Sequence, residues 1–158
     1  MSRMVITGGA GLLGLNWAIR KASTYDIHLW LHKKNINLDG ISSHFIELSN
    51  VDAIAKALDL IKPDVVINAA GLTSVYGCEH NPKHSELANF IIAKNIAIAT
   101  SKRSIKLVQV STDHLFAGTT SLNNEQSPIK CLNTYAKHKS MAENEVLAKH
   151  PDALVLRT

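Results

Sequence analysis

Hydrophobic and polar residues divide the chain into short apolar runs and longer segments in which apolar positions recur every three or four residues. Short runs of this kind, bounded by turn residues, are typical of strands, including those buried on both faces of a sheet. They predict strands over 4–6, 27–31, 44–48, 65–67, 106–110 and 153–156.

The segments between these runs predict about five helices. The clearest of them lie over 51–58, 86–100 and 134–149. Ser49 or Asn50 can cap the first of these three, because both side chains accept hydrogen bonds from the amides of a first helical turn. Polar residues dominate 71–82 and 118–133, which therefore predict loops.

Strands that alternate with helices predict a parallel sheet wound by right-handed crossovers. The expected fold is α/β: a Rossmann-type doubly wound parallel sheet of about six strands with helices on both faces. The chain has no internal repeat and no linker, so residues 1–158 are expected to form one domain. Ligands of this fold bind at the carboxyl ends of the strands, which directs attention to the segment after each strand.

Composition narrows the class of protein. The chain has 158 residues, 46% of them hydrophobic, and its net charge of +4 is too small for a nucleic-acid-binding surface. Cys78 and Cys131 lack metal-ligand spacing and predict free thiols, and the eight histidines show no ligand pattern, so no metal site is expected. No apolar segment reaches the length of a membrane span, which makes a cytoplasmic protein the default expectation.

The stretch over 5–14 holds the first candidate site. Gly8, Gly11 and Gly14 lie between a predicted strand and a predicted helix, the arrangement that brings a pyrophosphate to a helix N-terminus. The spacing differs from Gly-x-Gly-x-x-Gly, and glycines at such a turn can also serve only to allow tight packing. The loop by itself leaves both interpretations open.

Two more segments follow predicted strands at the same edge. Asn68-Ala69-Ala70-Gly71 has small residues against which a cofactor ribose can lie, although a tight strand exit explains it nearly as well. Ser111-Thr112-Asp113 offers a hydroxyl to a substrate oxygen, although capping of the strand exit is the commoner role of Ser and Thr.

Tyr135 and Lys139 are four residues apart on a predicted helix and so share one face. A nearby ammonium lowers the pKa of a phenol from about 10, as an acid or base for a carbonyl/alcohol pair requires. Such pairs also occur by chance on solvated faces. The order of glycine loop, small-residue segment, hydroxyl segment and Tyr–Lys pair favours a common site.

The residues after the second strand bear on the cofactor. NAD sites usually place a carboxylate there for the ribose 2′-hydroxyl, whereas basic residues accommodate the 2′-phosphate of NADP. Here His32, Lys33 and Lys34 follow the strand, and the first acid is Asp39. The expected cofactor is NADP(H) rather than NAD(H), the alternative being that the lysines form a solvated turn.

Together these motifs resemble the extended short-chain dehydrogenase/reductase superfamily, most closely its dTDP-4-dehydrorhamnose reductase (sugar-nucleotide reductase) branch. The Ser-Thr-Asp and Tyr-x-x-x-Lys segments make the resemblance specific, and it covers the whole chain. It is carried by Thr7-Gly8-x-x-Gly11-x-x-Gly14, by 63–70, by Thr73 with Glu79, by Ser111-Thr112-Asp113-x-Leu115-Phe116-x-Gly118, by Asn133-x-Tyr135-Ala136-x-x-Lys139 with Ala142-Glu143, and by Leu156-Arg157-Thr158.

The resemblance implies a role for each matching residue. Tyr135 would donate a proton to the substrate carbonyl as hydride arrives, and Thr112 would bind the same oxygen. Lys139 would hold the nicotinamide ribose and lower the pKa of Tyr135, and Asn89 would brace the active-site helix. The implied cofactor contacts are Gly8, Gly11, Leu12 and Leu13 at the pyrophosphate, Glu47 and Leu48 at the adenine, and Ala69, Ala70, Gly71 and Thr73 near the ribose and nicotinamide.

The chain departs from the branch at several points. Tyr76 and His114 stand where the branch has Asp and Tyr, and Leu12 stands where it is often polar, so the sugar and the nucleotide are left open. In the branch, a small C-terminal domain follows and closes over the substrate, whereas this sequence stops at Thr158. We expect that domain to be absent from this chain, which is either a fragment of a longer reductase or a naturally short protein. In either case cofactor binding is more plausible than turnover, and the apolar surface left uncovered predicts self-association or poor stability.

The resemblance implies an NADP(H)-dependent reductase of the 4-keto group of a nucleotide-linked deoxysugar. Two alternatives stay open: a non-catalytic NADP-binding regulatory subunit, and a nucleotide-sugar epimerase or dehydratase that uses the same Tyr–Lys pair. The intact set of Thr112, Tyr135 and Lys139 favours the enzyme. The expected partners are a nucleotide sugar and a second copy of the chain, with no nucleic acid and no membrane.

Overall fold

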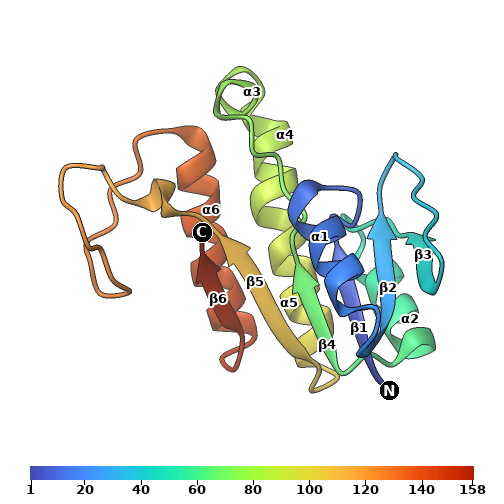
Figure 1. The fold of residues 1–158 in the computed structure, drawn as a ribbon. Helices are drawn as coiled ribbons and strands as arrows, with labels where there is room; N and C mark the ends of the chain where they lie inside the picture. Colours follow the sequence, from blue (N-terminus) through green and yellow to red (C-terminus); the bar gives the residue numbers. More distant parts are fainter.

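The computed structural model describes residues 1–158 and contains one six-stranded sheet in the order β3-β2-β1-β4-β5-β6 (Figure 1). All neighbouring strands are parallel, so that Met4 of β1 pairs with Ile27 on one side and Val65 on the other. The doubly wound parallel sheet predicted from the sequence is therefore confirmed. The strands are β1 (Ser2–Thr7), β2 (Tyr25–Leu31), β3 (Ile41–Phe45), β4 (Val65–Asn68), β5 (Lys106–Ser111) and β6 (Leu154–Arg157).

Helices connect the strands, and side-chain caps define where several of them begin. The Asn50 side chain accepts hydrogen bonds from the amides of Asp52 and Ala53, and Asn133 caps the helix that carries Tyr135 in the same way. The helices are α1 (Leu12–Lys21), α2 (Val51–Ile61), α3 (Val75–His80), α4 (Pro82–Glu86), the π-helical segment η1 (Leu87–Ile91), α5 (Ile92–Ser101), the 3₁₀ turn η2 (Asp113–Leu115) and α6 (Thr134–Lys149). The segments α4, η1 and α5 follow one another without a break.

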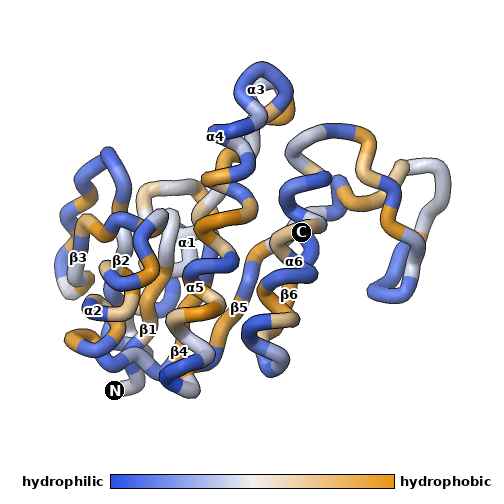
Figure 2. Tube along the Cα trace, turned by 180° about the vertical axis from the view of Figure 1, so that it is seen from behind, coloured by the Kyte–Doolittle hydropathy of each residue, from blue (hydrophilic) through white to orange (hydrophobic).

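Helices lie on both faces of the sheet, but they cover the two faces unequally. The larger core joins one face to α2, α5 and α6 through residues such as Val66, Leu58 and Ile96. The smaller core joins the other face to α1, with Ala18 packed among strand residues. Figure 2 shows hydrophobic residues concentrated in the central strands and in α5. Leu154 of β6 is 54% exposed, so the second face is incompletely covered at β6.

The boundaries of three elements differ from the sequence-based prediction. The third strand was expected over 44–48 but spans Ile41–Phe45, because its pairing with β2 sets the register of this edge strand. The predicted loop over 71–82 contains α3, since Ser74 accepts a hydrogen bond from the Gly77 amide and caps a short helix. The helix expected over 86–100 already begins at α4 and carries the π-helical segment.

The loop over 118–133 contains no helix or strand, as predicted, and it projects beyond β6 and α6 (Figure 1). No helix in the chain combines the length and the apolar character that a membrane span requires.

Candidate active site

The glycine loop packs tightly against the end of β4. Gly8 has a φ of +64°, and a Cβ there would lie 2.6 Å from the carbonyl oxygen of Ala69. A Cβ on Gly14 would lie 2.8 Å from the carbonyl oxygen of Gly8. Close packing thus explains these two glycines. Gly11 begins α1 with no side-chain cap and no acid in the first turn, which leaves the first-turn amides of that helix available to an anion.

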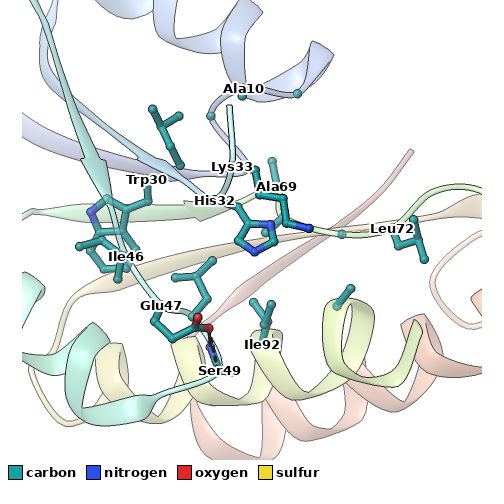
Figure 3. A pocket seen from close by; sticks show the side chains of 18 of the residues that line it. Ala10, Trp30, His32, Lys33, Ile46, Glu47, Ser49, Ala69, Leu72 and Ile92 are labelled. Carbon is teal, nitrogen blue, oxygen red and sulfur yellow. Dashed lines mark hydrogen bonds between the residues drawn. The ribbon is translucent and has the colours of Figure 1, made fainter. Parts of the chain in front are cut away.

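A pocket of about 490 Å³ opens at the carboxyl ends of β1, β2 and β4 (Figure 3). It lies between the glycine loop, the segment after β2, the β3–α2 connection and the helix that begins with α4. The predicted cofactor residues that line it are Gly8, Gly11, Lys33, Lys34, Glu47, Leu48, Ala69, Ala70 and Gly71. Leu12, Leu13, Thr73, Tyr135 and Lys139 are not among its lining residues, and Leu12 is 85% exposed.

Part of the pocket wall was missed by the sequence analysis. Figure 3 shows Trp30 beside Ile46 on one side, and Ile92 of α5 facing the pocket from below. His84 and Leu87 also belong to this wall. The sequence did carry a signal for this part of the wall. The long helix after β4 has an apolar side, and its N-terminal end must lie at the same sheet edge as the glycine loop.

Charged groups of both signs border the pocket. His32 and Lys33 project into it in Figure 3, and Lys34 follows them. Glu47 lies below His32 in Figure 3, and its Oε1 accepts hydrogen bonds from the amide and the hydroxyl of Ser49 at 3.0 and 2.6 Å. These bonds lower the pKa of the Glu47 carboxyl and orient it, so it is ionised at neutral pH.

Tyr135, Thr112 and Lys139 come together where β5 ends beside α6, and each is at most 8% exposed. The Thr112 hydroxyl accepts a hydrogen bond from the His114 amide at 3.2 Å and so caps η2. Capping was the alternative role given to this segment in the sequence analysis. The His114 ring meets Tyr135 edge-on, with ring centres 5.7 Å apart. The Thr112 hydroxyl lies beside Tyr135, and Lys139 lies one helical turn further along α6, so the three residues lie in one region at the end of β5.

The expectation that Lys139 lowers the pKa of Tyr135 is wrong for this structure. Burial raises the pKa of the Tyr135 phenol above its ordinary value, the neighbouring Thr112 hydroxyl partly opposes this, and Cys78 and Asp113 add to the rise. Lys139 instead donates to the backbone carbonyl of Val110 at 2.6 Å. Desolvation of the phenolate is thus the largest cause of the shift, and the Lys139 ammonium is not among its causes.

The pKa of Lys139 is shifted as well. Burial lowers the pKa of its ammonium to about 8, and the nearby Glu143 carboxylate opposes that change. Glu143 is also buried, and its Oε2 forms an ion pair with an Arg157 guanidinium nitrogen at 2.8 Å. Tyr135, Lys139 and Glu143 follow at intervals of four residues along α6, so one helix face carries the phenol, the ammonium and the carboxylate.

A line of buried polar side chains links the glycine-loop strand to Lys139. Thr7 donates to Asn68 at 2.5 Å, Asn68 donates to Gln109 at 2.7 Å, and Gln109 donates to the Val110 carbonyl at 2.8 Å. That carbonyl is also the acceptor for Lys139. The line crosses β1, β4 and β5 near their carboxyl ends and fixes these strand ends relative to one another. No cluster of three or more His, Cys, Asp or Glu side chains is placed to hold a metal ion.

Known proteins are similar to this chain in sequence and in fold. The dTDP-4-dehydrorhamnose reductase of Mycolicibacterium smegmatis is 29% identical over 99% of this chain and 45% of its own length. The methionine adenosyltransferase 2 subunit beta of Xenopus tropicalis is 33% identical over 98% of this chain and 46% of its own. The chain thus spans about half the length of these relatives.

The fold comparison agrees with the sequence comparison. The crystal structure of a dTDP-4-dehydrorhamnose reductase from Bacillus anthracis in complex with NADP superposes with a TM-score of 0.86 and 28% identity, over 99% of this chain and 53% of that one. The family described as RmlD substrate binding domain matches residues 2–158. With nearly every residue inside that match, the chain belongs to the RmlD substrate binding domain family.

Proposed function

We propose that residues 1–158 form the NAD(P)-binding domain of an NADP(H)-dependent reductase that acts on the 4-keto group of a nucleotide-linked deoxysugar. One observation carries the proposal: Thr112, Tyr135 and Lys139 cluster at the same sheet edge as a pocket whose wall includes the glycine loop. The named reductases among the relatives, one of them solved with NADP, support the choice of reaction and cofactor.

The residues present fit such a cofactor. The Gly8 position leaves no space for a Cβ, so backbone rather than side chains borders this part of the pocket. The uncapped N-terminus of α1, where Leu12 and Leu13 supply amides, suits the pyrophosphate. Lys33 and Lys34 would bind the 2′-phosphate. Glu47 and Leu48 would contact the adenine, and 69–71 with Thr73 would border the ribose and nicotinamide.

The bound cofactor would supply hydride to the substrate carbonyl. Tyr135 would then donate a proton to the carbonyl oxygen, and its raised pKa keeps the phenol protonated at neutral pH. Thr112 would donate a hydrogen bond to the same oxygen and orient it. The Lys139 ammonium, positioned by the Val110 carbonyl, would hold the ribose hydroxyls, since a pKa of about 8 leaves it mostly charged at pH 7.

Cofactor preference is tested by fluorescence titration with NADPH and NADH. NADPH should bind more tightly, and a variant with Lys33→Ser and Lys34→Ser should lose about tenfold in NADPH affinity while NADH binding changes little. Lys137→Ser is the matched control, because Lys137 is an exposed lysine of α6 that does not line the pocket. Equal affinity for both cofactors in the unaltered protein would reject the preference.

Turnover is tested with NADPH and dTDP-4-dehydrorhamnose, using both the 158-residue chain and the product of its complete reading frame. NADPH oxidation that Tyr135→Phe abolishes, without loss of NADPH binding, is the expected result. The likeness to the methionine adenosyltransferase subunit supports a second candidate, a regulatory cofactor-binding subunit. NADPH binding without oxidation in the complete product, on this and other 4-keto sugar nucleotides, would favour that candidate.

A further inference from the structure

An ion pair that the proposed function does not use joins β6 to α6. Arg157 Nε donates to both carboxylate oxygens of Glu143, at 3.1 and 3.3 Å, and Nη2 donates to Oε2 at 2.8 Å. The side chains of Arg157 and Glu143 are 21% and 6% exposed. Two guanidinium nitrogens thus hold one buried carboxylate, an arrangement that fixes direction as well as distance.

A second contact holds the same guanidinium. Its central carbon lies 5.4 Å from the centre of the Phe116 ring, within the range of a cation–π interaction. Phe116 directly follows η2, the turn that Thr112 caps, and Arg157 pairs in register with Ser111 at the end of β5. Arg157 is therefore fixed to the same end of β5 at which the proposed catalytic residues lie.

Lys139 is a second cation beside the same carboxylate. It precedes Glu143 by four residues on α6, a spacing at which lysine and glutamate can pair on a helix. Both residues are buried, and the Glu143 carboxylate opposes the lowering of the Lys139 pKa. Lys139 nevertheless donates to the Val110 carbonyl at 2.6 Å, and Glu143 pairs with Arg157 instead. Two cations thus lie beside one buried carboxylate, and the arginine occupies it.

Loss of the guanidinium would free this carboxylate for Lys139. Glu143 would otherwise be a buried charge without a partner, which is strongly unfavourable. The Lys139 ammonium lies one helical turn away on a flexible four-carbon stem, so it can turn to Glu143. The Val110 carbonyl would lose Lys139 but keep the Gln109 side chain as a donor at 2.8 Å. Nothing buried would then be left unpaired by the exchange.

We propose that Arg157 is a positioning residue: by occupying the Glu143 carboxylate, it keeps the Lys139 ammonium on the Val110 carbonyl. Arg157 does not line the pocket, so it acts through Lys139 and not on the cofactor. The consequence for cofactor binding rests on the proposed function, in which the ammonium at this position holds the ribose hydroxyls. The competition between the two cations does not rest on it.

The direct test is the crystal structure of Arg157→Met at pH 7. Lys139 Nζ should lie within hydrogen-bond distance of a Glu143 oxygen and away from the Val110 carbonyl. Glu143→Gln added to Arg157→Met removes the carboxylate, so the ammonium should return to the Val110 carbonyl. An Arg157→Met structure in which Lys139 still contacts that carbonyl would overturn the proposal, and so would a double variant in which Lys139 does not return.

A second measurement is the dissociation constant of NADPH at pH 7. Arg157→Met should raise it about tenfold, the effect of one lost hydrogen bond from a charged group, and the double variant should restore it. Glu143→Gln alone should keep the affinity, because it removes the competing acceptor; this variant also decides the matter if Arg157→Met does not fold. An ion pair that only held β6 to α6 would weaken binding equally in both single variants, so equal losses would overturn the proposal.

Arg103→Met is the matched control. Arg103 also binds a carboxylate through Nε and Nη2, both at 2.7 Å from Asp59, but this pair joins α2 to the end of α5. Its loss should change neither the position of Lys139 nor the affinity for NADPH. If NADPH binds to none of these proteins, the proposed function fails, whereas the crystal structures still decide on the position of Lys139.

Discussion

Replacement of Lys139 by methionine separates the cost of a buried ammonium from the loss of its hydrogen bond. Methionine has a similar length and fills the same apolar surroundings without a charge. The Val110 carbonyl that Lys139 contacts keeps the Gln109 side chain as a donor at 2.8 Å. Glu143 keeps Arg157 at 2.8 Å, so the substitution leaves no buried group without a partner.

The expected magnitude follows from the pKa of Lys139, which burial lowers from 10.5 to about 8. At about 1.4 kcal/mol per pKa unit, the charged side chain destabilises the folded protein by about 3 kcal/mol at pH 7. Above pH 8 the folded protein releases this proton, whereas the unfolded chain keeps it until about pH 10.5. The unaltered protein therefore gains stability as the pH rises, and the advantage of Lys139→Met should shrink to about 2 kcal/mol at pH 9.

Urea denaturation followed by the fluorescence of the buried Trp30 measures this difference at pH 7 and pH 9. Lys137→Met is the matched control, because Lys137 is exposed on the same helix and its removal should change the free energy of unfolding little. A Lys139→Met protein that is no more stable than the original at pH 7 would refute the reasoning. An advantage that does not shrink at pH 9 would refute it as well.

Three further substitutions test other parts of the structure. Gly8→Ala should lower the free energy of unfolding by about 2 kcal/mol in urea, because the left-handed backbone and the nearby carbonyl leave no place for a methyl group. Ser111→Ala should raise the melting temperature, with a gain of about 1 kcal/mol, since the Ser111 hydroxyl is buried without a partner; no change or a loss would contradict this. Leu154→Lys should reduce self-association in sedimentation velocity, because this half-exposed leucine lies on the incompletely covered sheet face; unchanged sedimentation would place any association elsewhere.

Local signals in the sequence explain why much of the fold could be predicted. The helix Thr134–Lys149 has the predicted limits, since Asn133 caps its start and Pro151 follows its end. The buried central strands were also found, because continuous apolar runs leave few alternatives. Strand β3 was displaced in the prediction because an edge strand takes its register from its one neighbour, and its own Ser42 and Ser43 carry no apolar signal.

The site could be predicted as far as topology alone determines it. Parallel strands carry the segments that follow them to one edge, so the pocket and the cluster at Tyr135 follow from element order. The contact between Ser85 and His138 spans 53 residues and depends on how two helices pack, for which no pattern in the chain gives a signal. The spacing of Tyr135 and Lys139 was informative, but spacing does not reveal burial, and burial raises the pKa of the tyrosine.

The buried polar line from Thr7 to Lys139 explains why the glycine loop and the Lys139 contact depend on the same strand register. Buried polar groups favour one arrangement strongly when every member has a partner, because any slip leaves a donor or acceptor unpaired. Asn68 and Gln109 are each 1% exposed, and each pairs with the side chain on the neighbouring strand. A shift of one residue in β4 or β5 would turn these amides to the opposite face of the sheet. The register that places the glycine loop beside the β4 exit is therefore the same register that presents the Val110 carbonyl to Lys139.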